Sequence, residues 1–169
     1  MKTRKITLTS VLCAISLVIF VIEAQIPPLI PVAGVKLGLS NVVVLFTKVL
    51  LGTRCALLVL LTKVFLGNLF TGTIVSFFYS LVGGIVCFLA ECIALKFLSR
   101  QQIWAVSIIG GAFHNIGQVL TACILIGNSK IIWYLALLVP VGMVTGAFVG
   151  VCTLYTLKAL DKLRRGVMR

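Results

Sequence analysis

The chain has 169 residues, of which 61% are hydrophobic and 11% charged, and it carries a formal net charge of +12 at pH 7. Soluble domains are about 45–50% apolar and about 25% charged, so this composition excludes a water-soluble domain and indicates an integral membrane protein. The basic residues lie between apolar runs and form no basic face, so we expect no nucleic-acid partner and a single membrane domain, residues 1–169.

The first apolar segment, residues 6–24, follows the basic N-terminus MKTRK. Several more apolar segments come after it, so we expect an uncleaved first span rather than a signal peptide that is removed. Ser10 and Ala14 form a ridge of small residues on this span, four residues apart and therefore on one helix face. Such a ridge can serve packing within the bundle or contact with a partner protein, and the sequence leaves both open.

A proline-rich stretch, IPPLIPVAGVK, follows this span and contains three of the four prolines. Proline fixes φ and removes a hydrogen-bond donor, so the stretch cannot remain helical and should form a stiff, extended loop. We expect the loop on the outer side of the membrane, either as a connector or as a lid over a binding site. The lid residues would be Pro27, Pro28, Pro31 and Gly34.

Five more apolar segments lie at 37–52, 54–70, 72–97, 103–126 and 131–157. A helix that crosses about 30 Å of hydrocarbon needs roughly 20 residues, so each segment is a candidate span, although the first two are short. If the N-terminus is cytoplasmic, most of the 15 Lys and Arg residues lie on the cytoplasmic side, as the positive-inside rule requires. The sequence therefore predicts an all-α bundle of six transmembrane helices with both termini in the cytoplasm.

Polar side chains inside these spans gather at similar depths, in the outer half or near the midplane, if each residue advances the helix by about 1.5 Å. Ionisable groups in a membrane are costly and indicate a functional site by default. The positive charges should suit an anionic or electron-rich ligand such as a phosphate, a diphosphate or a carboxylate. Structural alternatives are that Lys63 snorkels or pairs with Glu23, and that the amides only join helices. The predicted substrate-binding residues are Lys36, Asn41, Lys63, Asn68, Tyr79, His114, Asn115 and Gln118.

Two further patterns indicate helix contacts rather than a binding site. Lys48 and Glu91 fall at similar depth in the inner half of their spans, so we expect a structural ion pair. The last span carries a double G-x-x-x-G motif, which lets another helix approach closely. Its glycines are Gly142, Gly146 and Gly150.

The sequence offers no catalytic machinery. It has no G-x-x-x-x-G-K-[ST] phosphate loop, and its three acids, Glu23, Glu91 and Asp161, are far apart. Magnesium-dependent diphosphate chemistry normally needs clustered carboxylates. The six cysteines are scattered without a C-x-x-C pair. We therefore expect no catalytic residue, no metal site, no cofactor and no enzyme activity from this chain alone.

The order of a basic N-terminus, TSVLCAISLVIFVIEAQIP, a proline-containing loop, GVKLGLSNVVVL and then GGAFHNIGQ resembles the Gx transporter family. That family is also labelled heptaprenyl diphosphate synthase component I and is similar to the substrate-binding S components of energy-coupling factor (ECF) vitamin transporters. The resemblance covers most of the chain, and VKLGLSN and HNIGQ are its more specific parts.

The resemblance implies a six-helix S-component bundle whose first outer loop covers a ligand pocket. It also implies docking, chiefly through the first helix, to a membrane coupling (T) subunit driven by two ATPase subunits. S components typically dock through an A-x-x-x-A patch. The nearest match here is Ser10 and Ala14, followed by Val18 instead of alanine, which departs from the pattern.

The expected function is therefore capture of a small, anionic vitamin- or isoprenoid-like ligand at the outer face of a bacterial plasma membrane, with membrane lipid around the bundle. The alternative is a non-catalytic membrane accessory subunit of prenyl diphosphate or quinone synthesis. Prenyl synthases use aspartate-rich motifs that this chain lacks. The sequence leaves the ligand open between a flavin, a prenyl phosphate, a quinone precursor and another vitamin.

Overall fold

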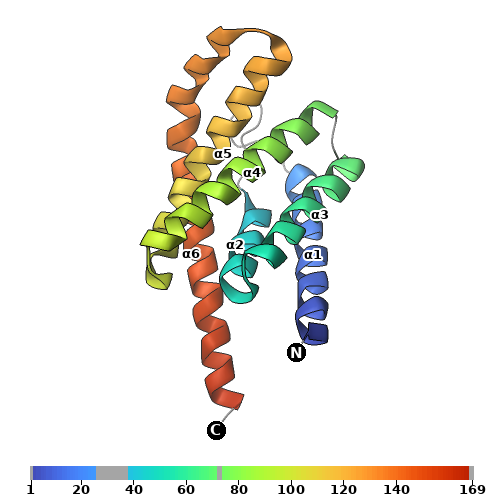
Figure 1. Ribbon diagram of the computed structural model, residues 1–169, viewed down its shortest axis with the longest axis vertical. Helices are drawn as coiled ribbons and strands as arrows, with labels where there is room; N and C mark the ends of the chain where they lie inside the picture. Colours follow the sequence, from blue (N-terminus) through green and yellow to red (C-terminus); the bar gives the residue numbers. More distant parts are fainter. Residues whose placement is uncertain (1, 26–37, 72–73, 168–169) are drawn as a thin grey trace.

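The computed structural model describes residues 2–25, 38–71 and 74–167, and within these ranges the chain is helical and contains no strand. Two short 3₁₀ helices, η1 (Arg100–Gln102) and η2 (Ser129–Tyr134), precede the last two long helices. The six α-helices are α1 (Lys2–Gln25), α2 (Leu39–Leu51), α3 (Thr53–Thr71), α4 (Ile74–Phe97), α5 (Ile103–Ile126) and α6 (Leu135–Val167) (Figure 1).

The protein is a multi-pass membrane protein, because five of these helices are long and apolar enough to cross a membrane. The exception is α2, which has 13 residues. At about 1.5 Å per residue, α2 extends for about 20 Å, which is short of the roughly 30 Å hydrocarbon core. The start of α1 and the end of α6 lie at the same end of the molecule (Figure 1). Six complete crossings and cytoplasmic termini stay predictions.

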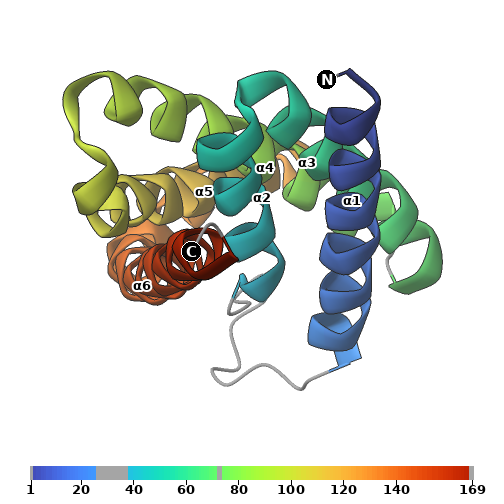
Figure 2. The ribbon, with the colours of Figure 1, turned by 90° about the horizontal axis from the view of Figure 1, so that it is seen from below.

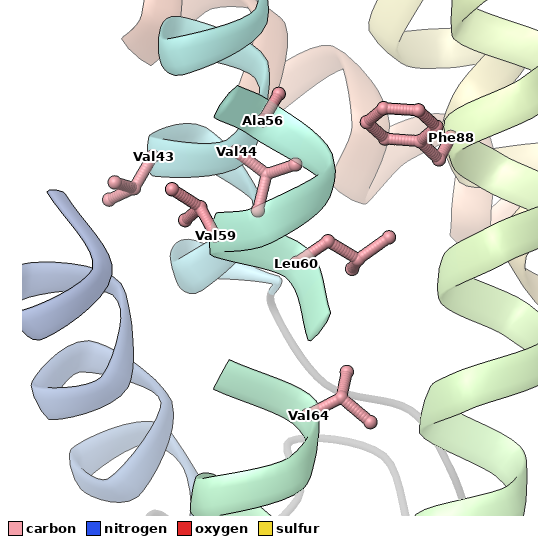
Figure 3. Packing of buried hydrophobic residues seen from close by; sticks show 7 residues of the cluster. All are labelled: Val43, Val44, Ala56, Val59, Leu60, Val64 and Phe88. Carbon is pink, nitrogen blue, oxygen red and sulfur yellow. The ribbon is translucent and has the colours of Figure 1, made fainter. Parts of the chain in front are cut away.

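The short helix α2 lies between α1 and α6 and also contacts α3 (Figure 2). Buried residues lie on more than one side of α2, so this helix is an internal element rather than a lipid-facing one. Val43 and Val44 belong to one cluster of buried residues with side chains of α3 and with Phe88 of α4, and Figure 3 shows Val43 on the side of α2 that faces away from Phe88. Leu45 belongs to a second cluster with Ile103 and Leu157. The two clusters fix α2 in the middle of the bundle.

The predicted glycine ridge of α6 lies in the contact between α5 and α6. A Cβ atom on Gly142 would lie 2.5 Å from the carbonyl oxygen of Gly111, and one on Gly146 would collide with the carbonyl oxygen of Ser107. A Cβ on Gly150 would lie 2.6 Å from the Cα of Trp104. All three glycines therefore allow close approach of two helices of the same chain, which is how small residues promote packing in lipid.

Candidate ligand-binding site

A cavity of about 260 Å³ lies inside the bundle, and residues from all six α-helices line it, together with Gly38 before α2. Apolar side chains such as Phe20, Leu60 and Val149 form part of its wall. The polar and charged part of the lining is broader than the sequence indicated. It consists of Glu23, Ser40, Asn41, Lys63, Ser76, Tyr79, Ser80, Glu91, Ser107, His114, Asn115, Gln118 and Thr145.

Six of the eight predicted binding residues line this cavity. They are Asn41, Lys63, Tyr79, His114, Asn115 and Gln118. Asn68 is buried on α3 but is absent from the lining; its Nδ2 donates to the carbonyl oxygen of Val64, and its Oδ1 has no hydrogen-bond partner in the described part of the chain. Lys36 and the lid residues Pro27, Pro28, Pro31 and Gly34 lie outside the described residues.

Helical spacing explains how α5 supplies one wall of the cavity. Ser107, Gly111, His114 and Gln118 recur every three or four residues and therefore share one face of the helix. The neighbouring Asn115 is buried and donates from Nδ2 to the carbonyl oxygen of Leu138, which joins α5 to α6 beside the cavity. Ser107 and Thr145 were missed in the sequence because a single hydroxyl in an apolar span gives no signal of which way it faces.

Lys63 reaches the first turn of α2 from α3. Its side chain is 97% buried, and Nζ donates to Ser40 Oγ at 3.1 Å and to Asn41 Oδ1. Both acceptors are neutral, so these contacts hold the ammonium group without cancelling its charge. Lys63 therefore places a positive charge at the cavity wall, beside the start of α2.

Glu23, near the end of α1, caps the same end of α2. Its carboxylate is buried and accepts hydrogen bonds from the backbone N–H groups of Gly38 and Ser40. The first N–H groups of a helix have no partner within the helix, and the helix dipole favours a negative charge beside them. Gly38 has φ 73°, a left-handed conformation that glycine adopts without strain. Glu23 thus ties the end of α1 to the cavity wall.

Replacing Glu23 by alanine should destabilise the start of α2. Buried N–H groups that lose their acceptor cost about 1–3 kcal/mol. We expect a loss of unfolding free energy in that range and faster amide hydrogen exchange at residues 38–41 than at the middle of α2. Thr9→Val is the matched control, because Thr9 is also buried on α1 but its hydroxyl donates only within its own helix, to the carbonyl oxygen of Lys5. Equal exchange in both variants would contradict the capping role.

An ion pair lies at the other end of the cavity, which we call the floor. Lys48 Nζ of α2 is 2.5 Å from Glu91 Oε2 of α4, and both side chains are almost fully buried. The same ammonium group donates to the carbonyl oxygen of Phe88 at 3.1 Å and lies 3.8 Å from the centre of the Phe88 ring. Glu91 also accepts from Cys87 Sγ. The pair links α2 to α4 across the floor.

The charged groups described in and beside the cavity are two carboxylates and two ammonium groups. The acids of the lining are Glu23 and Glu91, Lys63 is the lysine among the described lining residues, and Lys48 pairs with Glu91 in the floor. Lys36, the other cation expected at this site, lies outside the described residues, so the expected excess of positive charge stays a prediction. Most of the polar lining consists of hydroxyl and amide groups, which donate and accept hydrogen bonds without a net charge. Such a cavity suits a compact ligand with many hydrogen-bonding groups.

No group of three or more His, Cys, Asp and Glu side chains that could hold a metal ion occurs in residues 2–25, 38–71 and 74–167.

The small-residue ridge of α1 faces outward. Ser10 and Ala14 are exposed, as is Val18 in the next turn, whereas Ser16 and Phe20 on the other side of the helix are buried. The ridge is therefore not used for packing within the bundle, unlike the glycine ridge of α6. It remains open to lipid or to a partner helix.

Comparison with known protein families identifies the family of this chain. A family model described as heptaprenyl diphosphate synthase component I matches residues 12–156, a range that contains every described residue of the cavity lining. No curated protein and no solved structure gives a significant match.

Proposed function

This chain belongs to the heptaprenyl diphosphate synthase component I family, and from that premise we propose that it is the substrate-binding membrane subunit, or S component, of an ECF-type uptake transporter. The observation that carries the proposal is the internal cavity, which gathers polar side chains from separate helices inside an apolar bundle. Buried polar groups are costly unless they are hydrogen-bonded, and concave sites with a few convergent polar groups are the usual ligand sites of proteins.

The ligand that fits this lining is small and carries at most one strong negative charge. Lys63 would bind a carboxylate or a similar anionic group, and His114, Gln118 and Tyr79 would hydrogen-bond the remainder of the molecule. A diphosphate would bring more negative charge than Lys63, the one lysine among the described lining residues, balances, and it would approach the carboxylates of Glu23 and Glu91. A monoanionic, vitamin-like molecule is therefore the favoured ligand class.

Energy for uptake would come from partner subunits. The sequence has no phosphate loop, so ATP hydrolysis would be carried out by two ATPase subunits, coupled through a membrane T subunit. The exposed ridge of Ser10 and Ala14 on α1 is the surface that we propose for docking to the T subunit. The loop that contains Pro27, Pro28 and Pro31 would close the cavity from outside.

The second candidate function is a membrane accessory subunit of prenyl diphosphate or quinone synthesis, which the family description favours. The cavity volume of about 260 Å³ argues against it as a site for a long prenyl chain. Pockets for drug-sized molecules measure about 300–1,000 Å³, so a chain of seven isoprene units would not fit inside. In this role the protein would have to bind the prenyl chain on its surface.

The double variant Lys63→Ala, His114→Ala tests the proposed site. Gently purified protein, measured by native mass spectrometry, should carry a small molecule at one per chain, and denatured extracts should identify it. A hydrogen bond to a charged group contributes about 1.5–3 kcal/mol, so the double variant should bind this molecule at least about tenfold more weakly. A matched control is Lys130→Ala, Gln101→Ala, because both side chains are exposed and lie outside the cavity.

Unchanged ligand retention in the Lys63→Ala, His114→Ala variant would show that the site is wrong. An empty wild-type protein that co-purifies with a soluble prenyl synthase, and without ATPase subunits, would support the accessory role instead. A thermal unfolding midpoint close to that of the control variant separates loss of binding from loss of folding.

A further inference from the structure

A second concave region lies apart from the cavity, in a groove of about 540 Å³ between α4 and α5. Only apolar residues line it. Ala90 and Ala94 are buried and form its base, whereas Leu89, Ile93 and Phe97 are more than half exposed and form a wall. The small side chains of the two alanines leave room for the groove, and the larger side chains beside them enclose it.

The length of the groove matches one leaflet of a bilayer. Its lining on α4 runs from Val86 to Phe97, which at about 1.5 Å per residue is about 17 Å. Half of the roughly 30 Å hydrocarbon core is about 15 Å. A partner helix that crosses the membrane would follow α4 for twice that length, so the dimensions favour a single hydrocarbon chain over a helix.

Positive charge lies at one end of the groove. Lys96 is in the last turn of α4, is exposed, and forms no ion pair with any residue in the described ranges. Arg100 follows in η1, and its guanidinium is 3.6 Å from the carboxylate of Asp161, with both side chains about half exposed. Trp104, in the first turn of α5, is 46% exposed at the same end, and tryptophan is enriched where a membrane meets water.

We propose that this groove is a binding site for one acyl chain of an anionic phospholipid, whose phosphate group contacts Lys96. The apolar lining holds the chain, the one-leaflet length matches it, and the unpaired lysine at the interface complements the negative headgroup. The site is independent of the internal cavity and of its ligand. We expect one lipid to stay bound to each chain when detergent replaces the other lipids.

Native mass spectrometry of the full-length protein in mild detergent tests this proposal. Palmitoyl-oleoyl phosphatidylglycerol and palmitoyl-oleoyl phosphatidylcholine, which share their acyl chains, are each titrated. We expect one phosphatidylglycerol per chain, bound about fivefold more tightly than phosphatidylcholine. Lys96→Gln should remove this preference, and Lys162→Gln, which changes an exposed lysine on α6, should keep it.

A second pair of variants locates the acyl chain. Ile93→Ala removes part of the groove wall and should weaken binding of both lipids about threefold or more. Leu58→Ala changes a side chain of similar exposure on α3, outside the groove, and should leave binding unchanged. Equal affinity for the two lipids in the wild type would overturn the proposal. Lipid binding that Ile93→Ala leaves unchanged would overturn it too. Protein dimers that form in place of lipid-bound monomers, and that Ile93→Ala dissociates, would show that a second copy occupies the groove.

Discussion

Replacing Lys48 by methionine should destabilise the protein by about 3–5 kcal/mol, the largest effect that we expect of any single substitution here. The change leaves the carboxylate of Glu91 buried without its partner, since the two groups are 2.5 Å apart and both side chains are more than nine-tenths buried. It also removes the cation from above the Phe88 ring. Unfolding in mixed detergent and SDS micelles measures the loss.

The exposed ion pair of Arg100 and Asp161 is the matched control. Its charges are 3.6 Å apart and about half exposed, so Asp161→Asn should cost less than about 1 kcal/mol. The double variant Lys48→Met, Glu91→Met should recover most of the stability, because apolar side chains can replace a buried pair at little cost. A Lys48→Met variant that is as stable as Asp161→Asn would contradict a buried, paired arrangement at the floor.

Gly146→Ala should be the second most damaging of these changes. The new Cβ atom would collide with the carbonyl oxygen of Ser107 and lie 3.1 Å from the Cα of Ile108, and both are backbone atoms that cannot turn away. Helices α5 and α6 would have to separate. Overpacking of this kind costs about 1–3 kcal/mol, and we expect the upper part of that range because the neighbours are rigid. The same micelle unfolding experiment measures it.

Gly84→Ala provides the comparison for Gly146→Ala. A Cβ there would lie 3.1 Å from Leu60 Cδ1, the far end of a flexible side chain that can move. Both substitutions sit inside helices, where alanine is favoured over glycine by about 1 kcal/mol. Both variants therefore gain the same helix propensity from alanine, and they differ in the atoms that the new Cβ would meet. Equal stability of the two would show that α5 and α6 are not held by this close contact.

The two interactions together explain why the cavity keeps its shape. The glycine contact holds α5 close to α6, and Gly111 and Gly146 from that contact also line the cavity. The Lys48–Glu91 pair holds α2 to α4 at the floor. A bundle in a membrane gains little from the hydrophobic effect between helices, so packing and polar links must fix its geometry. Variants at Gly146 or Lys48 should therefore affect ligand retention through the cavity walls.

The sequence by itself determined the class of protein and most of the helices. The segment expected at 103–126 coincides with the helix α5, Ile103–Ile126, and each other segment overlaps one helix. The larger differences are at the first helix, which begins at Lys2, and at the last, which begins at Leu135 and continues to Val167. These features depend on local properties: the length of an apolar run, the turn residues between runs and the periodicity of one helix. His114 and Gln118 are four residues apart and therefore share one helix face, and both line the cavity.

Only the tertiary structure decided which helix face meets which neighbour. Depth along a helix says nothing about its rotation, so Asn68 was expected in the cavity and lies outside its lining, whereas Ser107 and Thr145 lie in it. The two small-residue ridges are alike in spacing, yet one packs against α5 and the ridge at Ser10 faces outward. Glu23 accepts a hydrogen bond from Gly38, fifteen residues later, at the start of another helix. Such contacts join residues distant in the chain, and their partners are set by packing in three dimensions, which no local pattern encodes.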